Sequence, residues 1–95
     1  MLNEAIISYG KYTDNQRKVF CALVDLAVEG FVYVPVKKLH EITGVTRPTI
    51  YAVLNVLQID GIIVKDKDHA GAFRIQQDKI DFIISLYEKS SNLYK

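Results

Sequence analysis

The sequence predicts a small α+β domain in which a helix-turn-helix is followed by a β-hairpin. Residues 36–61 contain two stretches with apolar side chains at helical spacing, and a glycine separates them. Residues 62–76 contain two short runs of β-forming residues around a turn-rich tip. The chain has 95 residues, of which 49% are hydrophobic, so it is long enough to bury one modest core. These observations favour one domain over residues 1–95.

The first twelve residues predict a short helix that ends near Gly10. Leu2, Ala5, Ile6 and Tyr9 recur at helical spacing. A helix of this length is not stable alone, so its apolar face needs a partner. That partner is either the subunit's own core or a second subunit; without one, the segment would fray.

A longer helix is expected from Thr13 to about Glu29, with Gly30 ending it. Thr13 and Gln16 fit a capping box, in which each side chain binds a backbone N–H of the first turn. Two apolar stripes predict a helix that is buried on two sides and supports the helix-turn-helix. The first stripe is Phe20, Leu23, Val24 and Ala27, and the second is Val19, Ala22 and Leu26.

The next segment predicts a short strand over residues 31–35 and then a short helix. Pro35 is expected to start that helix, because the first turn does not use the N–H that proline lacks. Leu39 and Ile42 would form its inward face. Gly44 follows where the chain must reverse, and glycine adopts positive φ there without strain.

The second helix of the motif is expected over residues 46–60. Val45 is an apolar plug before it, Thr46 is a good N-cap, and Pro48 falls in the first turn. Gly61 would close the helix. The buried face is Ile50, Val53, Leu54 and Leu57, and the polar face is Arg47, Thr49, Tyr51, Asn55 and Gln58.

The last third of the chain predicts a hairpin and a final helix. Strands are expected over residues 62–65 and 72–76, and the helix begins at Asp78, where an acid suits the positive helix end. Its apolar residues form two stripes. We mainly expect that one stripe packs on the subunit's own core and that the other faces a second subunit. The alternative is a single broad stripe that packs on the core. The stripes are Ile80, Ile83, Ile84 and Tyr87, and Phe82, Leu86 and Leu93.

The residues of the motif resemble the winged helix-turn-helix DNA-binding domain of small MarR/ArsR-like transcriptional regulators. The resemblance covers roughly residues 13–76, and it implies that residues 46–60 enter the DNA major groove while residues 62–76 form the wing. It also implies that the strand at residues 31–35 pairs with the wing. The chain has His40 where the family usually has a small residue, so either the helices cross more widely or the ring turns outward. The resemblance rests on Leu39, Gly44-Val45-Thr46-Arg47, Thr49-Ile50-Tyr51, Leu54, Leu57 and Gly61-Ile62-Ile63.

Composition argues against several other classes of protein. No uncharged apolar run approaches the ~18 residues of a membrane span, and the first residues do not read as a signal peptide. Cys21 is the only cysteine and lies in an apolar helix pattern, which predicts a buried thiol and a reducing, cytoplasmic setting. His40 and His69 lie in different elements, so we expect no enzyme, no cofactor and no metal site. Asp66, Asp68 and His69 are expected to be a solvated turn.

Double-stranded DNA is the partner that the polar residues favour, although the net charge is only +1. Residues 37–74 carry six basic and four acidic residues, a net of +2. Arg47 and Asn55 suit base edges, Thr49 suits a phosphate, and basic residues of the wing suit the backbone. The full set of expected DNA-binding residues is Lys37, Lys38, Thr46, Arg47, Thr49, Tyr51, Asn55, Lys65, Lys67, His69 and Arg74.

A homodimer is expected, because two apolar stripes leave one free for a second copy. Residues 1–12 and 78–95 would build it, and no small-molecule ligand or membrane partner is inferred. The sequence therefore predicts a small homodimeric transcriptional regulator. A winged-helix module for protein–protein contact, or a plasmid or phage replication or partition protein, is the alternative. The expected interface residues are Ile6, Tyr9, Phe82, Leu86 and Leu93.

Overall fold

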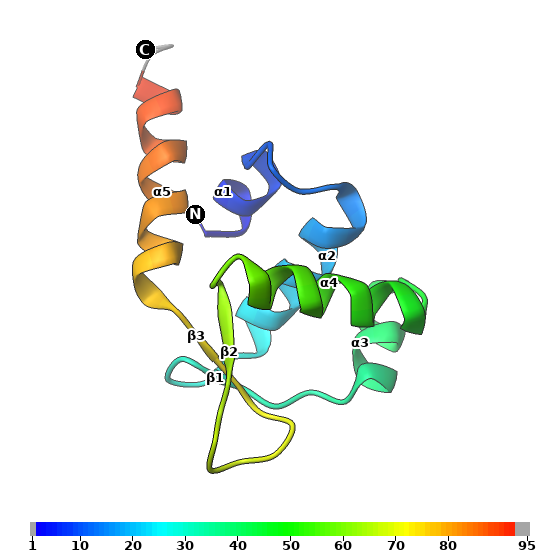
Figure 1. The fold of residues 1–95 in the computed structure, drawn as a ribbon. Helices are drawn as coiled ribbons and strands as arrows, with labels where there is room; N and C mark the ends of the chain where they lie inside the picture. Colours follow the sequence, from blue (N-terminus) through cyan, green and yellow to red (C-terminus); the bar gives the residue numbers. More distant parts are fainter. Residues whose placement is uncertain (1, 93–95) are drawn as a thin grey trace.

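The computed structural model describes residues 2–92, which form an α+β fold with five helices and one three-stranded antiparallel sheet. Figure 1 shows the order of the elements along the chain. The bounds are α1 Leu2–Ser8, α2 Asp14–Leu26, β1 Phe31–Val32, α3 Val36–Thr43, α4 Arg47–Ile59, β2 Ile63–Lys65, β3 Phe73–Ile75 and α5 Gln77–Asn92. None of these helices combines the length and the apolarity needed to cross a membrane.

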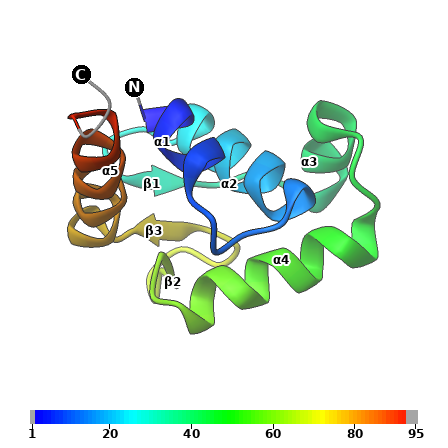
Figure 2. The same ribbon diagram turned by 90° about the horizontal axis from the view of Figure 1, so that it is seen from above.

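Helix α2 is the centre of the arrangement. It packs against α1, α3 and α4, and α1 also packs against α5. Figures 1 and 2 show α3 and α5 at opposite ends of the molecule, with α4 running alongside α2. The core lies between these helices, and Ile6, Phe20, Leu39 and Leu57 are fully buried in it. Each such side chain contributes about 1.5–3 kcal/mol by leaving water.

The N-terminal end of α2 confirms the predicted capping box. The Gln16 backbone N–H donates to the Thr13 hydroxyl over 3.3 Å, and the Thr13 backbone N–H donates to the Gln16 side chain over 2.9 Å. Two backbone donors that no helical carbonyl can reach are thereby satisfied.

The C-terminal end of α2 differs from the prediction, since the helix stops at Leu26 instead of near Glu29. Val28 and Phe31 exchange two backbone hydrogen bonds of 2.8 and 3.0 Å. Glu29 and Gly30 between them both have positive φ, 52° and 83°. Two consecutive residues of positive φ make a tight two-residue hairpin turn, which ended the helix three residues early.

The turn between α3 and α4 confirms the predicted reversal at Gly44, which has φ 75°. Three hydrogen bonds that involve side chains hold it. The Thr43 hydroxyl donates to the Leu39 carbonyl over 2.7 Å, and the Val45 N–H donates to the Thr43 hydroxyl over 3.1 Å. The ring of His40 is exposed and lies 2.8 Å from the Val45 carbonyl, to which its Nδ1 donates. Of the two expectations for His40, the ring turns outward.

Helix α4 has the predicted bounds within a residue, with Thr46 at the N-cap position and Pro48 in the first turn. The expected cap hydrogen bond is absent, which corrects our expectation for Thr46. Its hydroxyl instead donates to the Thr49 hydroxyl over 2.9 Å. The predicted apolar face is buried: Ile50, Val53, Leu54 and Leu57 are at most 7% exposed.

The wing is confirmed as a hairpin of β2 and β3, and β1 pairs with β3 as the resemblance implied. The sheet order is β1-β3-β2, with Arg74 opposite both Phe31 and Val64. Gly71 in the tip has φ 83°, and a Cβ there would lie 2.8 Å from the Tyr33 ring. The tip therefore packs on the segment that links β1 to α3.

One apolar expectation needs correction. Ile42, expected to face inward, is 48% exposed and borders an open groove beside Ile7 and Cys21. Helix α3 is only 8 residues long and buries Leu39 alone, so its last turn extends past the core. On α5, Ile80 and Ile83 are buried, whereas Phe82 is 55% exposed.

Replacing Gly44 by alanine should lower the free energy of unfolding by about 1–2 kcal/mol, because alanine is strained at positive φ although nothing blocks its Cβ. Gly10→Ala is the matched control, since its Cβ also meets nothing and its φ is not in the left-handed region. Chemical denaturation measures both. Equal stabilities of the two variants would contradict the role given to Gly44.

Candidate nucleic-acid interface

The polar face of α4 is the centre of the candidate site. Arg47 in the first turn is exposed, Tyr51 is 62% exposed, and Asn55 is exposed one turn further on. Thr49 is half-buried, and its hydroxyl accepts from Thr46. Residues four apart lie on one helix face, so Arg47, Tyr51 and Asn55 point the same way. No other part of the chain within residues 2–92 covers them.

Helix α3 adds Lys37 and Lys38 in its first turn, and both are exposed. Its N-cap is Pro35, which makes no side-chain cap hydrogen bond. The first backbone N–H groups of α3 and the two ammonium groups together form a local positive region, which suits a phosphate. The structure keeps both lysines where the sequence predicted them.

The wing carries its basic residues in two different states. Lys65 and Lys67 are exposed. His69 and Arg74 are instead tied to Asp66, whose side chain is only 6% exposed: His69 Nδ1 donates to it over 2.6 Å, and the Arg74 guanidinium lies 3.8 Å away. Arg74 also lies over the Phe31 ring, 5.4 Å from its centroid. His69 and Arg74 thus also make contacts within the wing that the sequence did not predict, while their side chains remain 76% and 58% exposed.

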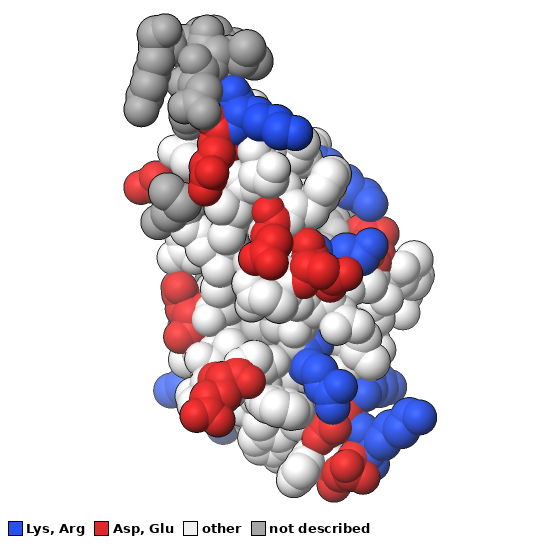
Figure 3. Space-filling view, turned by 90° about the vertical axis from the view of Figure 1, so that its left-hand side faces the viewer, with Lys and Arg blue, Asp and Glu red and all other residues white. Residues whose placement is uncertain are grey.

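The face that carries α5 has a different character. Figure 3 shows acidic and basic side chains interspersed there among uncharged ones, without a continuous basic patch. Nucleic-acid binding draws on concentrated positive charge. The face that carries α5 is therefore not the one that nucleic acid would favour. Figure 1 shows α4 crossing the molecule and the wing extending from its C-terminal end.

The C-terminal end of α4 is held by a contact that the sequence analysis missed. The Tyr12 hydroxyl donates to Asp60 Oδ2 over 2.7 Å, and Lys11 Nζ lies 3.4 Å from Asp60 Oδ1. Asp60 is the C-cap of α4, and Tyr12 lies in the segment between α1 and α2. Burial, and then the Asp60 carboxylate, raise the pKa of the Tyr12 phenol well above its usual range.

One signal for this contact was present in the sequence. An acid at the C-terminal end of a helix is disfavoured by the helix dipole. Asp60 lies at that end directly before Gly61. Such a residue needs a donor or a cation from elsewhere in the chain, but the sequence does not tell which one.

The residues expected at a subunit interface fall into three groups. Ile6 is fully buried in the subunit's own core, so it offers no surface to a second subunit; its neighbour Ile7 is 59% exposed instead. Phe82 is exposed, and Tyr9 and Leu86 are half-buried. Leu93 lies outside the described residues.

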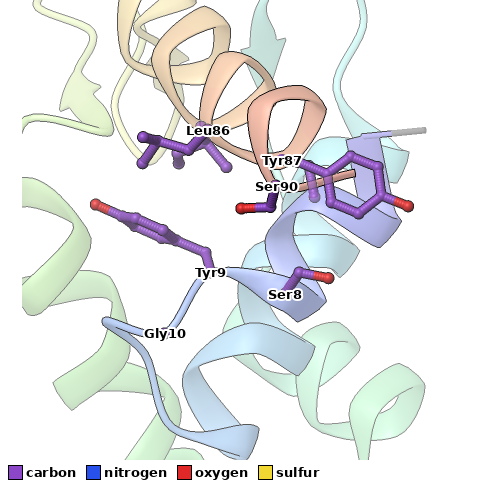
Figure 4. A pocket seen from close by; sticks show the side chains of 8 residues that line it. Ser8, Tyr9, Gly10, Leu86, Tyr87 and Ser90 are labelled. Atoms are coloured by element: carbon purple, nitrogen blue, oxygen red, sulfur yellow. The ribbon is translucent and has the colours of Figure 1, made fainter. Parts of the chain in front are cut away.

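Tyr9 and Leu86 line an open groove of about 510 Å³ between α1 and α5. Figure 4 shows Leu86 and Ser90 of α5 facing Tyr9 across it. The lining side chains are uncharged and include Ile83, Leu86 and Tyr87. The groove therefore offers shape and apolar contact rather than charge.

Other chemistry finds little support in the described residues. Within residues 2–92, no group of three or more His, Cys, Asp or Glu side chains converges as a metal site would require. Cys21 is half-buried, and burial followed by the nearby Asp25 raises the pKa of its thiol. A raised pKa disfavours the reactive thiolate.

Comparison with known proteins supports the fold. No family model matches the chain, and no curated protein sequence matches it. The fold is similar to that of TrmBL2, "an archaeal chromatin protein" whose structure "shows a novel mode of DNA binding", with a TM-score of 0.60 and 16% identity over 98% of this chain and 35% of that one. The fold is also similar to that of ligand-free NadR, with a TM-score of 0.59 and 16% identity over 97% of this chain and 65% of NadR. For BpsR of Bordetella bronchiseptica the TM-score is 0.59 and the identity is 17%, over 97% of this chain and 67% of BpsR.

These likenesses show a winged-helix fold, as the sequence predicted, and at such low identity they show the fold alone. The chain spans about a third of TrmBL2 and about two thirds of the other two proteins. DNA binding of BpsR is described as regulated by 6-hydroxynicotinic acid. Our expectation that this chain takes no small-molecule ligand is therefore left without support.

The Tyr12 contact predicts a loss of stability in alkali. The pKa of Tyr12 is higher in the folded chain than in the unfolded chain, where it is about 10. Above about pH 10 the unfolded chain loses this proton while the folded chain keeps it, so the free energy of unfolding falls with rising pH by up to about 1.4 kcal/mol per pH unit. The contribution is complete below pH 10 and lost as pH rises further.

Denaturation of the wild type and of Tyr12→Phe from pH 8 to 11.5 measures this effect. The variant should show a shallower decline, because it lacks the titrating group. Tyr51→Phe is the control, since Tyr51 is exposed. Identical pH profiles for the wild type and Tyr12→Phe would contradict the assigned contact.

Proposed function

We propose that the protein binds specific double-stranded DNA sites as a small homodimeric transcriptional regulator. In this proposal α4 enters the major groove and the wing lies on the backbone. The observation that carries it is the uncovered polar face of α4, opposite a fully buried apolar face. A helix held in this way presents side chains to a groove without disturbing its own core. Such a protein would act in the cytoplasm.

The side chains suggest a division of roles. Arg47 reaches a guanine edge or a phosphate, and Asn55 pairs with adenine. Thr46 and Thr49 form a hydroxyl pair suited to a phosphate oxygen. Lys37, Lys38, Lys65 and Lys67 supply the charge that fixes the register on the duplex. The net charge of +1 makes affinity per subunit modest, and a second subunit would make up for it.

The homodimer is supported by the surface of α5 and α1. Phe82 is a large apolar side chain left 55% exposed, and the groove lined by Tyr9 and Leu86 lies along the same helix. In an isologous contact, an exposed side chain of one copy fills a groove of the other and the reverse also holds. Two copies would place their α4 helices about one helical turn of DNA apart, near 34 Å.

Protein–protein contact without DNA is the second candidate. Ile59 at the end of α4 is 75% exposed, and Val64 in the wing is 42% exposed. Apolar side chains beside a polar helix face suit a protein partner. Val56 in the same helix is half-buried against the core and does not favour this alternative. A plasmid or phage replication or partition protein would use the same DNA surface as a repressor.

The double variant Arg47→Ala, Thr49→Ala tests the DNA surface. It should weaken binding to a duplex by about 1–3 kcal/mol, or about 5- to 150-fold in Kd, because it removes a base or phosphate contact. Lys89→Ala is the control, because it removes one positive charge from α5, outside the candidate DNA surface. A gel-shift series at two salt concentrations measures both. Failure of the wild type to shift duplex DNA at low salt would remove the DNA proposal.

Phe82→Glu tests the homodimer. Sedimentation at micromolar concentration should give about twice the chain mass of 10.8 kDa for the wild type and about one chain mass for the variant. A charge buried at an apolar interface is costly, whereas exposed Phe82 makes the change tolerable in a monomer. Ile59→Glu on α4 is the control and should remain dimeric. A monomeric wild type, or a dimeric Phe82→Glu, would place the interface elsewhere.

A further inference from the structure

We infer that the contact of Tyr12 and Lys11 with Asp60 is a positioning device. It fixes the C-terminal end of α4, and with it the start of the wing, in the orientation that binds DNA. The inference rests on the proposed DNA binding. It adds residues that touch no DNA themselves and act through α4.

The geometry points to a specific contact. Tyr12 and Asp60 are 48 residues apart in sequence, and their side chains meet at 2.7 Å in a part-buried environment. The side chain of Asp60 is 18% exposed and also pairs with Lys11. A hydrogen bond to a carboxylate is short and about twice as strong as a neutral one. The contact thus restrains the helix end more tightly than apolar packing alone, which allows sliding.

The position of Asp60 supports a purpose beyond helix stability. The C-terminal end of a helix carries partial negative charge, so an acid there lowers the stability of the isolated helix. The hydroxyl of Tyr12 and the ammonium of Lys11 offset that cost only when the segment between α1 and α2 is in place. Asp60 therefore connects the end of α4 to this segment.

The segment itself is held from several sides. Arg17 donates from Nε and from a terminal nitrogen to the Tyr9 carbonyl, over 3.3 and 3.1 Å. The Tyr12 ring meets the Tyr9 and Phe20 rings edge-on, with centroids 5.5 and 5.9 Å apart. A segment braced in this way transmits displacement instead of absorbing it.

The same segment lies between the proposed dimer surface and the DNA surface. Tyr9 and Gly10 line the groove between α1 and α5. Asp60 is followed by Gly61 and then by β2 of the wing. A shift of α1 against α5 would therefore displace the C-terminal end of α4 through the hydrogen bond from Tyr12 to Asp60. DNA affinity should depend on how α1 and α5 pack, although both are remote from the polar face of α4.

Tyr12→Phe is the sharpest test, because it removes one oxygen and leaves the aromatic packing. Asn3→Ala is the control, since it also removes a side-chain hydrogen bond between distant parts of the chain, from α1 to Asp25 of α2, that does not reach α4. Binding is measured at a temperature where both variants are fully folded, with a duplex that the wild type selects from a random pool. We expect the Kd of Tyr12→Phe to rise about 5- to 20-fold, because the variant loses part of the free energy of a hydrogen bond to a carboxylate. The Kd of Asn3→Ala should stay unchanged.

Amide hydrogen exchange supplies a readout that does not depend on DNA. The Gly61 and Ile62 N–H groups donate to the Gln58 and Leu57 carbonyls at the end of α4, and the Gly44 N–H donates to His40 at the far turn. In Tyr12→Phe the amides of Gly61 and Ile62 should exchange faster while that of Gly44 does not. A uniform acceleration would mean a merely stabilising role and overturn the inference.

Failure of the positioning role and failure of the proposed DNA binding would give different results. Unchanged affinity of folded Tyr12→Phe for a duplex that the wild type binds would overturn the positioning role and leave the proposed function intact. Binding of no duplex by the wild type would remove the proposed function, and the role in DNA binding with it. In that case the exchange measurement still decides whether the contact fixes the end of α4.

Discussion

The burial of one face of α4 is the constraint on which the rest of the structure depends. Ile50, Val53, Leu54 and Leu57 lie against the helices around them, and this fixes which side of α4 remains outside. The turn at Gly44 sets the angle at which α4 leaves α3. A change at either place would rotate the polar face. The candidate DNA surface is therefore a consequence of core packing and one left-handed residue.

The two ends of α4 are controlled in different ways. The N-terminal end is set locally, by the hydrogen bonds of Thr43 and His40 around the turn. The C-terminal end is set from a distance, by Tyr12 acting on Asp60. Because the segment that carries Tyr12 also borders the groove between α1 and α5, that groove and the polar face of α4 belong to one connected unit. We regard this connection as the route by which subunit packing would affect DNA binding.

Much of the fold was predictable because its signals are local. The capping box at Thr13, the turn at Gly44 and the buried face of α4 each follow from residues close together in sequence. The early end of α2 could not be predicted, because it depends on the pairing of Val28 with Phe31 and not on helix propensity. In the candidate site, the exposure of Arg47, Tyr51 and Asn55 followed from helical periodicity. Two sets of contacts could not be predicted, because they form only in the tertiary structure. These are the contacts of Asp66 with His69 and Arg74, and the hydrogen bond from Tyr12 to Asp60.

The central claim is that the polar face of α4 meets a DNA groove. The most direct measurement is an NMR titration of the protein with short duplex DNA, in which each backbone amide is followed. We expect the largest shifts at residues 47–55, at Lys37 and Lys38, and at the tip of the wing, with little change along the outer face of α5. Shifts confined to α5 and the groove that it forms with α1, with residues 47–55 unaffected, would contradict it.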